Sequence, residues 1–266
     1  MPIRVGVFGA GGRMGKSVAH AISSAEGLDL VAAVDPSFEG INVGEVTGVS
    51  GKHFSVVSSP ESLVVGGEPE VDVMVDFTHI DAARRNLEFC ADHGIHAVVG
   101  TSGFTEADYG LIRERFTKSN CLIAPNFAIG AVLMIRFAEL AAPYFDTAEI
   151  IELHHDGKID APSGTAVSTA ERMAAASDEW AADPTRSETI TGARGAKGPL
   201  GIPIHSVRMR GMVAHQEVLL GTMGQTLQLR HDSYDRSSFM PGVILAVRRI
   251  AEVAGLTVGL DRILDI

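Results

Sequence analysis

The sequence predicts an α/β protein in which an N-terminal Rossmann-type parallel sheet domain is joined to a smaller α+β domain with an open mixed sheet. Three features support this fold class. Short apolar runs alternate with helix-period stretches in the first half, a glycine-rich segment follows the first run, and the last apolar runs have no helix between them. Such alternation is typical of a parallel sheet that helices cover on both faces.

The first half of the chain supplies the elements of the parallel sheet. We expect strands at residues 3–8, 28–34, 71–76, 96–99 and 121–124, separated by helices at about 13–25, 80–93 and 105–118. In the first helix Met14, Val18, Ala21, Ile22 and Ala25 fall on one stripe, which we expect to pack on the sheet.

The pattern changes after Ala124 and predicts a second domain. We expect a helix at 127–145, a strand at 148–154, a helix near 163–180, and a meander of strands near 203–210, 213–221 and 225–231. Residues 178–201, rich in Gly, Pro, Ser and Thr, predict a surface loop. A final helix at 236–254 should return to the first domain. The predicted domains are 1–125 with 235–266, and 126–234.

Composition excludes several classes of partner. The chain of 266 residues carries a formal net charge of −11 and no run of Lys or Arg, so we expect no nucleic-acid partner. No apolar run reaches the roughly 18 residues of a membrane span and no leader pattern is evident, so we expect a cytoplasmic protein without membrane contact. Cys90 and Cys121 lack metal or redox spacing and are expected to be buried packing residues.

The glycine-rich segment after the first strand predicts a dinucleotide-binding loop. It contains Gly9, Ala10, Gly11, Gly12, Arg13, Met14 and Gly15, and Met14 occupies the third glycine position of GxGxxG. Asp35 ends the second strand 20 residues after Gly15, where an acid can accept hydrogen bonds from the ribose hydroxyls of NAD. A tight turn without a ligand is the structural alternative.

Two other functions remain open at this point. Ala10–Ser17 (AGGRMGKS) fits a relaxed Walker A motif and Val71–Asp76 a Walker B strand, which would indicate a P-loop NTPase. That function leaves Asp35 and a later histidine-lysine segment without roles. A non-catalytic NAD-binding regulatory module would keep the loop but would not need closely spaced acid-base residues.

Three further loops are expected at the carboxyl ends of strands, where ligands of open parallel sheets bind. They are Asp76-Phe77-Thr78, Gly100-Thr101-Ser102 and Ala124-Pro125-Asn126-Phe127. Ordinary helix capping by Thr and Asn is the alternative explanation, and capping and cofactor contact can coexist.

The segment from His154 to Thr165 predicts an anion site with a proton donor. His154 and His155 end a strand and should point to opposite faces unless the chain bends there, and Lys158 follows in a turn. Ser163-Gly164-Thr165 opens the next helix with free N–H groups, which suit a carboxylate. A strand end with exposed histidines and a Ser163 N-cap is the alternative. No carboxylate or third histidine stands at a metal-ligand spacing, so we expect no metal.

Taken together, these residues resemble the dihydrodipicolinate reductase family, also called 4-hydroxy-tetrahydrodipicolinate reductases, which act in the diaminopimelate route to lysine. The resemblance covers nearly the whole chain. It is carried by Val5–Gly15, Asp76–Thr78, Gly100–Phe104, Ala124–Gly130 and, most specifically, Glu152–Ala166 (ELHHDGKIDAPSGTA). Asn126–Leu133 and Val213–Val218 resemble actinobacterial members in particular.

The resemblance implies roles for individual residues. His154 would be the acid/base residue and Lys158 the second proton donor. Substrate would be bound by His155, Gly164 and Thr165, joined by Ser163. A hydride would pass from the nicotinamide of NADH or NADPH to ring C4 of a cyclic imine dicarboxylate, and the enamine formed would then be protonated. The first domain would bind the dinucleotide, and the second would bind the small dicarboxylate substrate and form a homotetramer through its sheet.

Two positions depart from the family pattern. Pro36 follows Asp35 where several members carry a basic residue able to meet the 2′-phosphate of NADP, so NADH should be used at least as well, although Arg13 could hold that phosphate. Ser102 stands where Thr is common, a conservative change for a hydroxyl or backbone contact.

Overall fold

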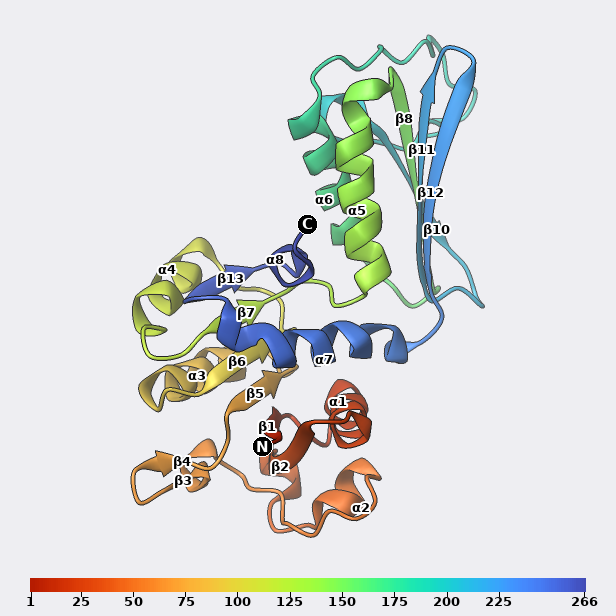
Figure 1. The fold of residues 1–266 in the computed structure, drawn as a ribbon. Helices are drawn as coiled ribbons and strands as arrows, with labels where there is room; N and C mark the ends of the chain where they lie inside the picture. Colours follow the sequence, from red (N-terminus) through yellow and green to blue (C-terminus); the bar gives the residue numbers. More distant parts are fainter. The chain divides into compact units, whose positions relative to one another are not determined.

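The computed structural model describes residues 1–266, which form two compact units (Figure 1). Unit 1 comprises Met1–Phe127 together with Phe239–Ile266, and unit 2 comprises Ala128–Ser238. The domain boundaries predicted after residues 125 and 234 lie within a few residues of these limits. None of the helices combines the length and apolar character needed to cross a membrane.

The core of unit 1 is a six-stranded sheet in which every paired strand is parallel. Its strands, in spatial order, are β13 (Leu256–Val258), β7 (Cys121–Ile123), β6 (His96–Val99), β5 (Val73–Asp76), β1 (Ile3–Phe8) and β2 (Leu28–Val34). From β1 the chain continues to β2 at one edge of the sheet. It then returns to β5 on the other side of β1 and continues outward through β6 and β7 in the opposite direction. Ligands of open parallel sheets lie beyond the carboxyl ends of the strands at such a reversal.

Helices cover both faces of this sheet, which confirms the predicted fold class. α1 (Arg13–Ser24) contacts α7 (Met240–Arg249), and α3 (Ile80–Asp92) contacts α4 (Glu106–Arg115). Right-handed crossovers that leave the sheet centre in opposite directions place their helices on opposite faces. Val18 and Ile22 of the predicted stripe in α1 are fully buried.

Several short elements of unit 1 were not predicted from the sequence. They are α2 (Val43–Thr47), the paired strands β3 (Val64–Val65) and β4 (Glu68–Pro69), α8 (Asp261–Leu264) and strand β13. The helix predicted at 236–254 is shorter, because 3-10 turns flank α7 and Pro241 fits only its first turn. Cys90 and Cys121 are buried and unpaired, as predicted.

Unit 2 has a mixed sheet covered on one face by two helices (Figure 1). In spatial order its strands are β12 (Gln225–Ser233), β11 (Ala214–Thr222), β8 (Thr147–His154), β10 (Pro203–Arg208) and β9 (Ala196–Lys197). β8 and β10 are parallel, and the other pairs are antiparallel. α5 (Ile129–Ala141) packs on α6 (Gly164–Ala176), and both bury apolar side chains against the sheet. The predicted open mixed sheet is confirmed.

The predicted meander is wrong in its strand order. β10 and β11 are consecutive in the chain, but β8 lies between them and pairs with both. Of the three strands predicted to form the meander, only β11 and β12 are joined as a hairpin, closed by Met223 and Gly224 with φ +79° at the glycine. Periodicity shows that a segment is a strand but not which strand it pairs with. Ile150 of β8 is fully buried, as suits a central strand.

The segment predicted as a surface loop is largely irregular and exposed, with only β9 and a 3-10 turn at Pro199–Gly201 in its last part. Arg194 organises it, since its guanidinium donates to Glu149 at 2.5 Å and to Asp183 at 3.2 Å. The Glu188 carboxylate accepts the backbone N–H groups of Gly192 and Arg194.

Candidate active site

In unit 1 the glycine-rich loop brings the start of α1 close to the end of β1. Gly9 adopts φ +68° and its carbonyl accepts the N–H of Gly12 at 3.0 Å. A Cβ on Gly15 would lie 2.0 Å from the Gly9 carbonyl oxygen, so only glycine allows this approach. Gly12 caps α1 without a side-chain hydrogen bond. The first-turn N–H groups of α1 can therefore bind a phosphate.

Asp35 lies directly after β2 and braces this loop. One carboxylate oxygen accepts the Gly11 N–H at 3.0 Å, and the other accepts the Ser37 N–H at 3.0 Å. A carboxylate has about four acceptor sites. Lone pairs therefore remain for the ribose hydroxyls that the sequence assigned to Asp35.

A cleft of about 640 Å³ in unit 1 contains Gly9, Gly12, Asp35, Phe77 and Thr78 of the predicted cofactor set. Its other lining residues include Ser58, Ser59, Pro60, Glu61, His79, Ala82, Arg85, Asn86 and Phe89, none of which was predicted. Four of them lie on α3 with the i, i+3, i+4, i+7 spacing of one helix face: Ala82, Arg85, Asn86 and Phe89. This spacing was the sequence signal that could have identified them. No motif marks the segment from Ser58 to Glu61.

Asp76 holds two of the predicted loops together. Its carboxylate is buried and accepts the Thr78 N–H at 2.8 Å, the Thr78 hydroxyl at 2.7 Å and the Thr101 hydroxyl at 2.9 Å. Asn86 donates to its other oxygen at 2.7 Å. The loops after β5 and β6 are thus joined by a carboxylate whose acceptor sites are largely used.

Aromatic packing shapes the rest of this edge of the sheet. A Cβ on Gly100 would lie 2.0 Å from the Phe77 ring, and that ring packs on Phe127 with centroids 5.6 Å apart. Ala124 and Phe127 are buried, Asn126 is half-buried, and Ser102 and Pro125 are exposed, as are Arg13 and Gly12 in the glycine-rich loop. Ala10 is fully buried and Met14 half-buried.

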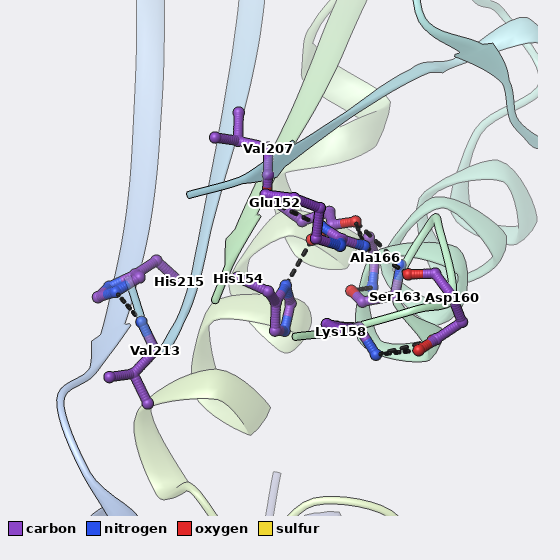
Figure 2. A network of polar contacts seen from close by, with 10 residues as sticks. Glu152, His154, Lys158, Asp160, Ser163, Ala166, Val207, Val213 and His215 are labelled. Atoms are coloured by element: carbon purple, nitrogen blue, oxygen red, sulfur yellow. Dashed lines mark hydrogen bonds and ion pairs between the residues drawn. The ribbon is translucent and has the colours of Figure 1, made fainter. Parts of the chain in front are cut away.

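In unit 2 the histidine at the end of β8 is fixed by a buried carboxylate (Figure 2). His154 Nδ1 lies 2.5 Å from Glu152 Oε2, and strand alternation puts these residues on the same face. Glu152 has no exposed surface, and Arg208 from β10 donates to both of its oxygens at 2.8 and 2.9 Å. The Ser163 N–H donates to Oε1 at 3.2 Å. One carboxylate therefore joins β8, β10 and the start of α6.

Burial and neighbouring charge act in opposite directions in this cluster. Burial would raise the pKa of Glu152, but hydrogen bonds from Arg208, Ser206 and His154 outweigh burial and hold that pKa below its ordinary value. Burial is the main cause that lowers the pKa of His154, and together with the charges of Lys158 and Arg208 it outweighs the hydrogen bond and charge of Glu152, which raise this pKa. His154 is therefore neutral and Glu152 ionised near pH 7.

Lys158 lies beside His154 but is engaged with an acid (Figure 2). Its ammonium donates to both carboxylate oxygens of Asp160, at 2.8 and 2.7 Å. Asp160 is mostly exposed, and its pKa is lowered chiefly by the hydrogen bond from Lys158. A substrate carboxylate would have to replace Asp160 as the partner of Lys158.

The remaining predicted substrate residues surround the start of α6. β8 ends at His154, so His155 lies in the following turn, exposed, and the simple alternation expected for the pair does not apply. Ser163 is buried and its hydroxyl caps α6 by accepting the Ala166 N–H at 3.2 Å. Gly164 is exposed and Thr165 half-buried. The alternative explanation, that Ser163 is a helix N-cap, is therefore correct for its hydroxyl. Gly164 and Thr165 form the open first turn of α6.

Sequence reasoning gave no role to Glu152, Asp160 and Arg208, which contact His154, Lys158 or each other. Glu152 and Asp160 stand within the predicted motif but looked like parts of a strand and a turn. Arg208 lies 56 residues from Glu152 in sequence, and only the parallel pairing of β8 with β10 brings them together. No group of three or more His, Cys, Asp or Glu side chains is arranged to hold a metal ion.

Comparison with known proteins decides the family. Two family models match: Dihydrodipicolinate reductase, N-terminus, over residues 3–127, and Dihydrodipicolinate reductase, C-terminus, over residues 130–264. The chain is 48% identical to the 4-hydroxy-tetrahydrodipicolinate reductase of Mycobacterium marinum over 99% of this chain and 100% of that protein. The chain belongs to the dihydrodipicolinate reductase family.

Further relatives agree. The 4-hydroxy-tetrahydrodipicolinate reductase of Corynebacterium urealyticum is 45% identical over 99% of both chains. The structure of a dipicolinate-bound dihydrodipicolinate reductase from Paenisporosarcina sp. TG-14 matches with a TM-score of 0.86 and 41% identity, covering 98% of this chain and 99% of that one. The predicted resemblance to actinobacterial members is confirmed.

The family fixes the reaction. The chain is an NAD(P)H-dependent 4-hydroxy-tetrahydrodipicolinate reductase of the diaminopimelate route to lysine. The P-loop NTPase that Ala10–Ser17 suggested and the non-catalytic NAD-binding regulatory module are therefore both wrong. The N-terminal sheet domain is the dinucleotide-binding part of the family.

Proposed function

We propose that unit 2 binds the substrate at the open first turn of α6 and that His154 and Lys158 handle its protons. The supporting observation is that one short stretch of chain, from the end of β8 to α6, carries both side chains and the unoccupied N–H groups of Gly164 and Thr165. A helix N-terminus and a lysine together neutralise a carboxylate.

The substrate class follows from this charge pattern. The Paenisporosarcina relative is described as bound to dipicolinate, an aromatic dicarboxylate. In our proposal one carboxylate of the ligand accepts hydrogen bonds from Gly164 and Thr165, and the other charge faces Lys158 and the exposed His155. Ser163 contributes by capping α6 rather than through its hydroxyl, since that hydroxyl is already engaged.

The protein's residues would act on the substrate in a fixed order. Lys158 leaves Asp160 for the substrate carboxylate, which offsets negative charge that would oppose hydride addition. The nicotinamide, when bound, supplies the hydride to ring C4. His154, made cationic beside the dianionic substrate, then donates a proton to the reduced enamine, with Lys158 as the second proton donor.

Unit 1 fits the dinucleotide that the family uses. The pyrophosphate would lie at the start of α1, against Gly11, Gly12 and Arg13, and a ribose would meet Asp35. The nicotinamide half would face two loops. These are the backbone from Gly100 to Thr101 with the exposed hydroxyl of Ser102, and the backbone from Ala124 to Phe127.

We propose that NADH and NADPH are both accepted, with NADH used at least as well. Asp35 is followed by Pro36, so no basic side chain directly follows the acid that would meet the ribose. Two exposed cations remain near this region: Arg13 in the glycine-rich loop, and Arg85, which lines the cleft from α3 and forms no ion pair. These would hold the 2′-phosphate of NADPH.

A matched pair of arginine variants tests the assignment of Arg85. Arg85→Ala should raise KM for NADPH by about 10–100-fold and change KM for NADH less, because loss of one charge-assisted contact costs about 1.5–3 kcal/mol. Arg84→Ala is the control, since the neighbouring Arg84 is engaged with Asp108 and Asp81. Equal effects of Arg85→Ala on the two cofactors would contradict the assignment.

The proposed proton chemistry is tested in a coupled assay. The product of an aspartate-semialdehyde and pyruvate condensing enzyme is supplied, and oxidation of NADH and of NADPH is followed separately. Lys158→Ala should lower kcat by about 10²–10⁴-fold, the usual contribution of acid-base catalysis. Lys197→Ala, on the exposed strand β9, should leave kcat unchanged. Normal turnover of Lys158→Ala would remove this residue from the mechanism.

We also propose that the enzyme is a cytoplasmic homotetramer joined through the sheet of unit 2. The sheet face away from α5 and α6 carries Ile151, Leu153, Val207 and Leu219 and is covered by no helix of this unit (Figure 1). Light scattering should give four times the chain mass of 28.1 kDa. Leu219→Glu should lower that mass, and an unchanged tetramer in this variant would place the interface elsewhere.

A further inference from the structure

We propose that Glu152 and Arg208 are a positioning pair: Glu152 holds His154 with its proton on Nδ1, leaving Nε2 as the atom that exchanges a proton with substrate, and Arg208 holds Glu152. This inference rests on the proposed role of His154. Glu152 has no exposed surface, and the terminal nitrogens of Arg208 donate to Glu152 and to the carbonyls of Val207 and Asp160, so neither residue is placed at the reacting atoms.

The tautomer follows from the hydrogen bonds around the carboxylate. An ionised carboxylate only accepts, so at 2.5 Å from Glu152 Oε2 the His154 Nδ1 must donate. A neutral imidazole that carries its proton on Nδ1 has its lone pair on Nε2. Figure 2 shows the ring directed with Nδ1 toward Glu152. The free nitrogen therefore lies on the side away from the buried carboxylate.

Arg208 makes this arrangement rigid. Its two terminal nitrogens reach both oxygens of Glu152, a forked geometry that fixes the carboxylate plane. One of them also donates to the Asp160 carbonyl at 2.6 Å. Arg208 is thus tied to the turn that carries Lys158, and Glu152 is tied to the α6 terminus through the Ser163 N–H. The pair aligns the proton donor and the anion site together.

Without Arg208 the site would be unstable as built. A buried carboxylate without a cation loses its ionised form or its position, because desolvation of an unpaired charge is costly. Protonated Glu152 would no longer be an acceptor only, and the His154 tautomer would no longer be fixed. The charged groups that face His154 are Glu152 on its own strand, Lys158 in the following turn and Arg208 on β10.

The test compares Glu152→Gln with wild type by kcat, KM and the pH profile. An amide can donate to Nδ1 and so favour the wrong tautomer. We expect kcat to fall about 10–100-fold, as for supporting residues in other sites, with KM for substrate changed less than about threefold. The alkaline limb of the kcat/KM profile, where His154 loses the proton that it donates, should move to lower pH, since one group that raises the pKa of His154 is gone.

Arg208→Lys and Arg208→Met provide the rescue comparison. The lysine keeps the charge but not the fork, so it should retain more kcat than the methionine. Gln216→Leu is the structural control: Gln216 is buried, pairs across from Glu152 on β11 and donates to Thr169 rather than to His154. It should lower Tm while leaving the pH profile of activity in place.

The tautomer can also be measured directly in the wild-type enzyme. Nitrogen-15 NMR of the wild-type enzyme should show a protonated Nδ1 and an unprotonated Nε2 for His154, assigned by comparison with His154→Gln. The opposite tautomer overturns the proposal. So does a folded Glu152→Gln enzyme with wild-type kcat and pH profile while His154→Ala is inactive. Full activity of His154→Ala would instead defeat the proposed role of His154.

Discussion

Carboxylates support the functional surfaces of both units, but they do so in different ways. In unit 1 Asp35 and Asp76 accept backbone N–H groups, hydroxyls and one amide, so they hold loops in shape without an ion pair. In unit 2 Glu152 is bound by an arginine and a histidine and is part of a charged network. Ligand binding in unit 1, where backbone groups form the site, should therefore be sensitive to added side-chain atoms. Activity that depends on unit 2, where charged side chains form the site, should be sensitive to loss of a charge or a change of tautomer.

The largest expected effect on cofactor binding is in the backbone-built site of unit 1. Gly15→Ala should raise Kd for NADH by about 10²-fold, because its Cβ would meet the Gly9 carbonyl oxygen at 2.0 Å and push the loop from α1. Fluorescence titration with NADH measures this. Gly110→Ala is the matched control in a helix where a Cβ meets nothing within 4 Å. Similar Kd values for the two variants would show that the loop is not held by this contact.

A smaller effect separates the two roles of Asp35. Asp35→Ala should raise KM for NADH more than KM for NADPH, because the ribose hydroxyl that an acid recognises is phosphorylated in NADPH. Some loss with both cofactors is expected, since the Gly11 N–H also loses its acceptor. Steady-state kinetics with each cofactor gives the ratio. Equal increases would mean that Asp35 only braces the loop.

Substitution of Asp76 should lower the free energy of unfolding more than it changes cofactor binding. Asp76→Asn places an amide NH₂ against groups that themselves donate, from Thr78, Thr101 or Asn86. The free energy of unfolding should fall by about 1–3 kcal/mol, the penalty for an unsatisfied buried polar group. Urea denaturation measures the loss. Asp92→Asn, on the exposed end of α3, should change it little, and equal losses would argue against the Asp76 network.

The smallest effect concerns acid stability. The pKa of Glu152 lies below its ordinary value of 4.5 in the folded protein, so this group stabilises the fold above that value. The contribution is lost as pH falls from about 4.5 through the folded pKa. Glu152→Gln should therefore flatten the decline of Tm with pH in this window. An unchanged slope would mean that other carboxylates account for the acid sensitivity.

The fold was largely predictable because its main strands and helices carry their own hydrophobic period. β1, β2 and β6 match their predicted bounds, and α1 buries the predicted stripe. β13 has only three residues and adds to the sheet by pairing with β7, a contact that no local pattern records. The order of β10, β8 and β11 was likewise set by pairing rather than by period.

The candidate site divides in the same way. His154, His155, Lys158 and the start of α6 are close in sequence, so their clustering was visible before the structure. Arg208 reaches Glu152 only because β10 pairs with β8, and an isolated arginine at the end of a predicted strand gives no signal. The engagement of Lys158 by Asp160 was also missed, because spacing cannot show whether nearby opposite charges meet.

The most direct test of the division between the two units is a pair of measurements on His154→Ala. Single-turnover kinetics should show reduction slowed by about 10²–10⁴-fold, and Kd for NADH should stay within about twofold of wild type. This result would assign proton transfer to unit 2 and leave cofactor binding to unit 1. Near-normal turnover, or a loss of NADH affinity as large as the loss of rate, would contradict the account.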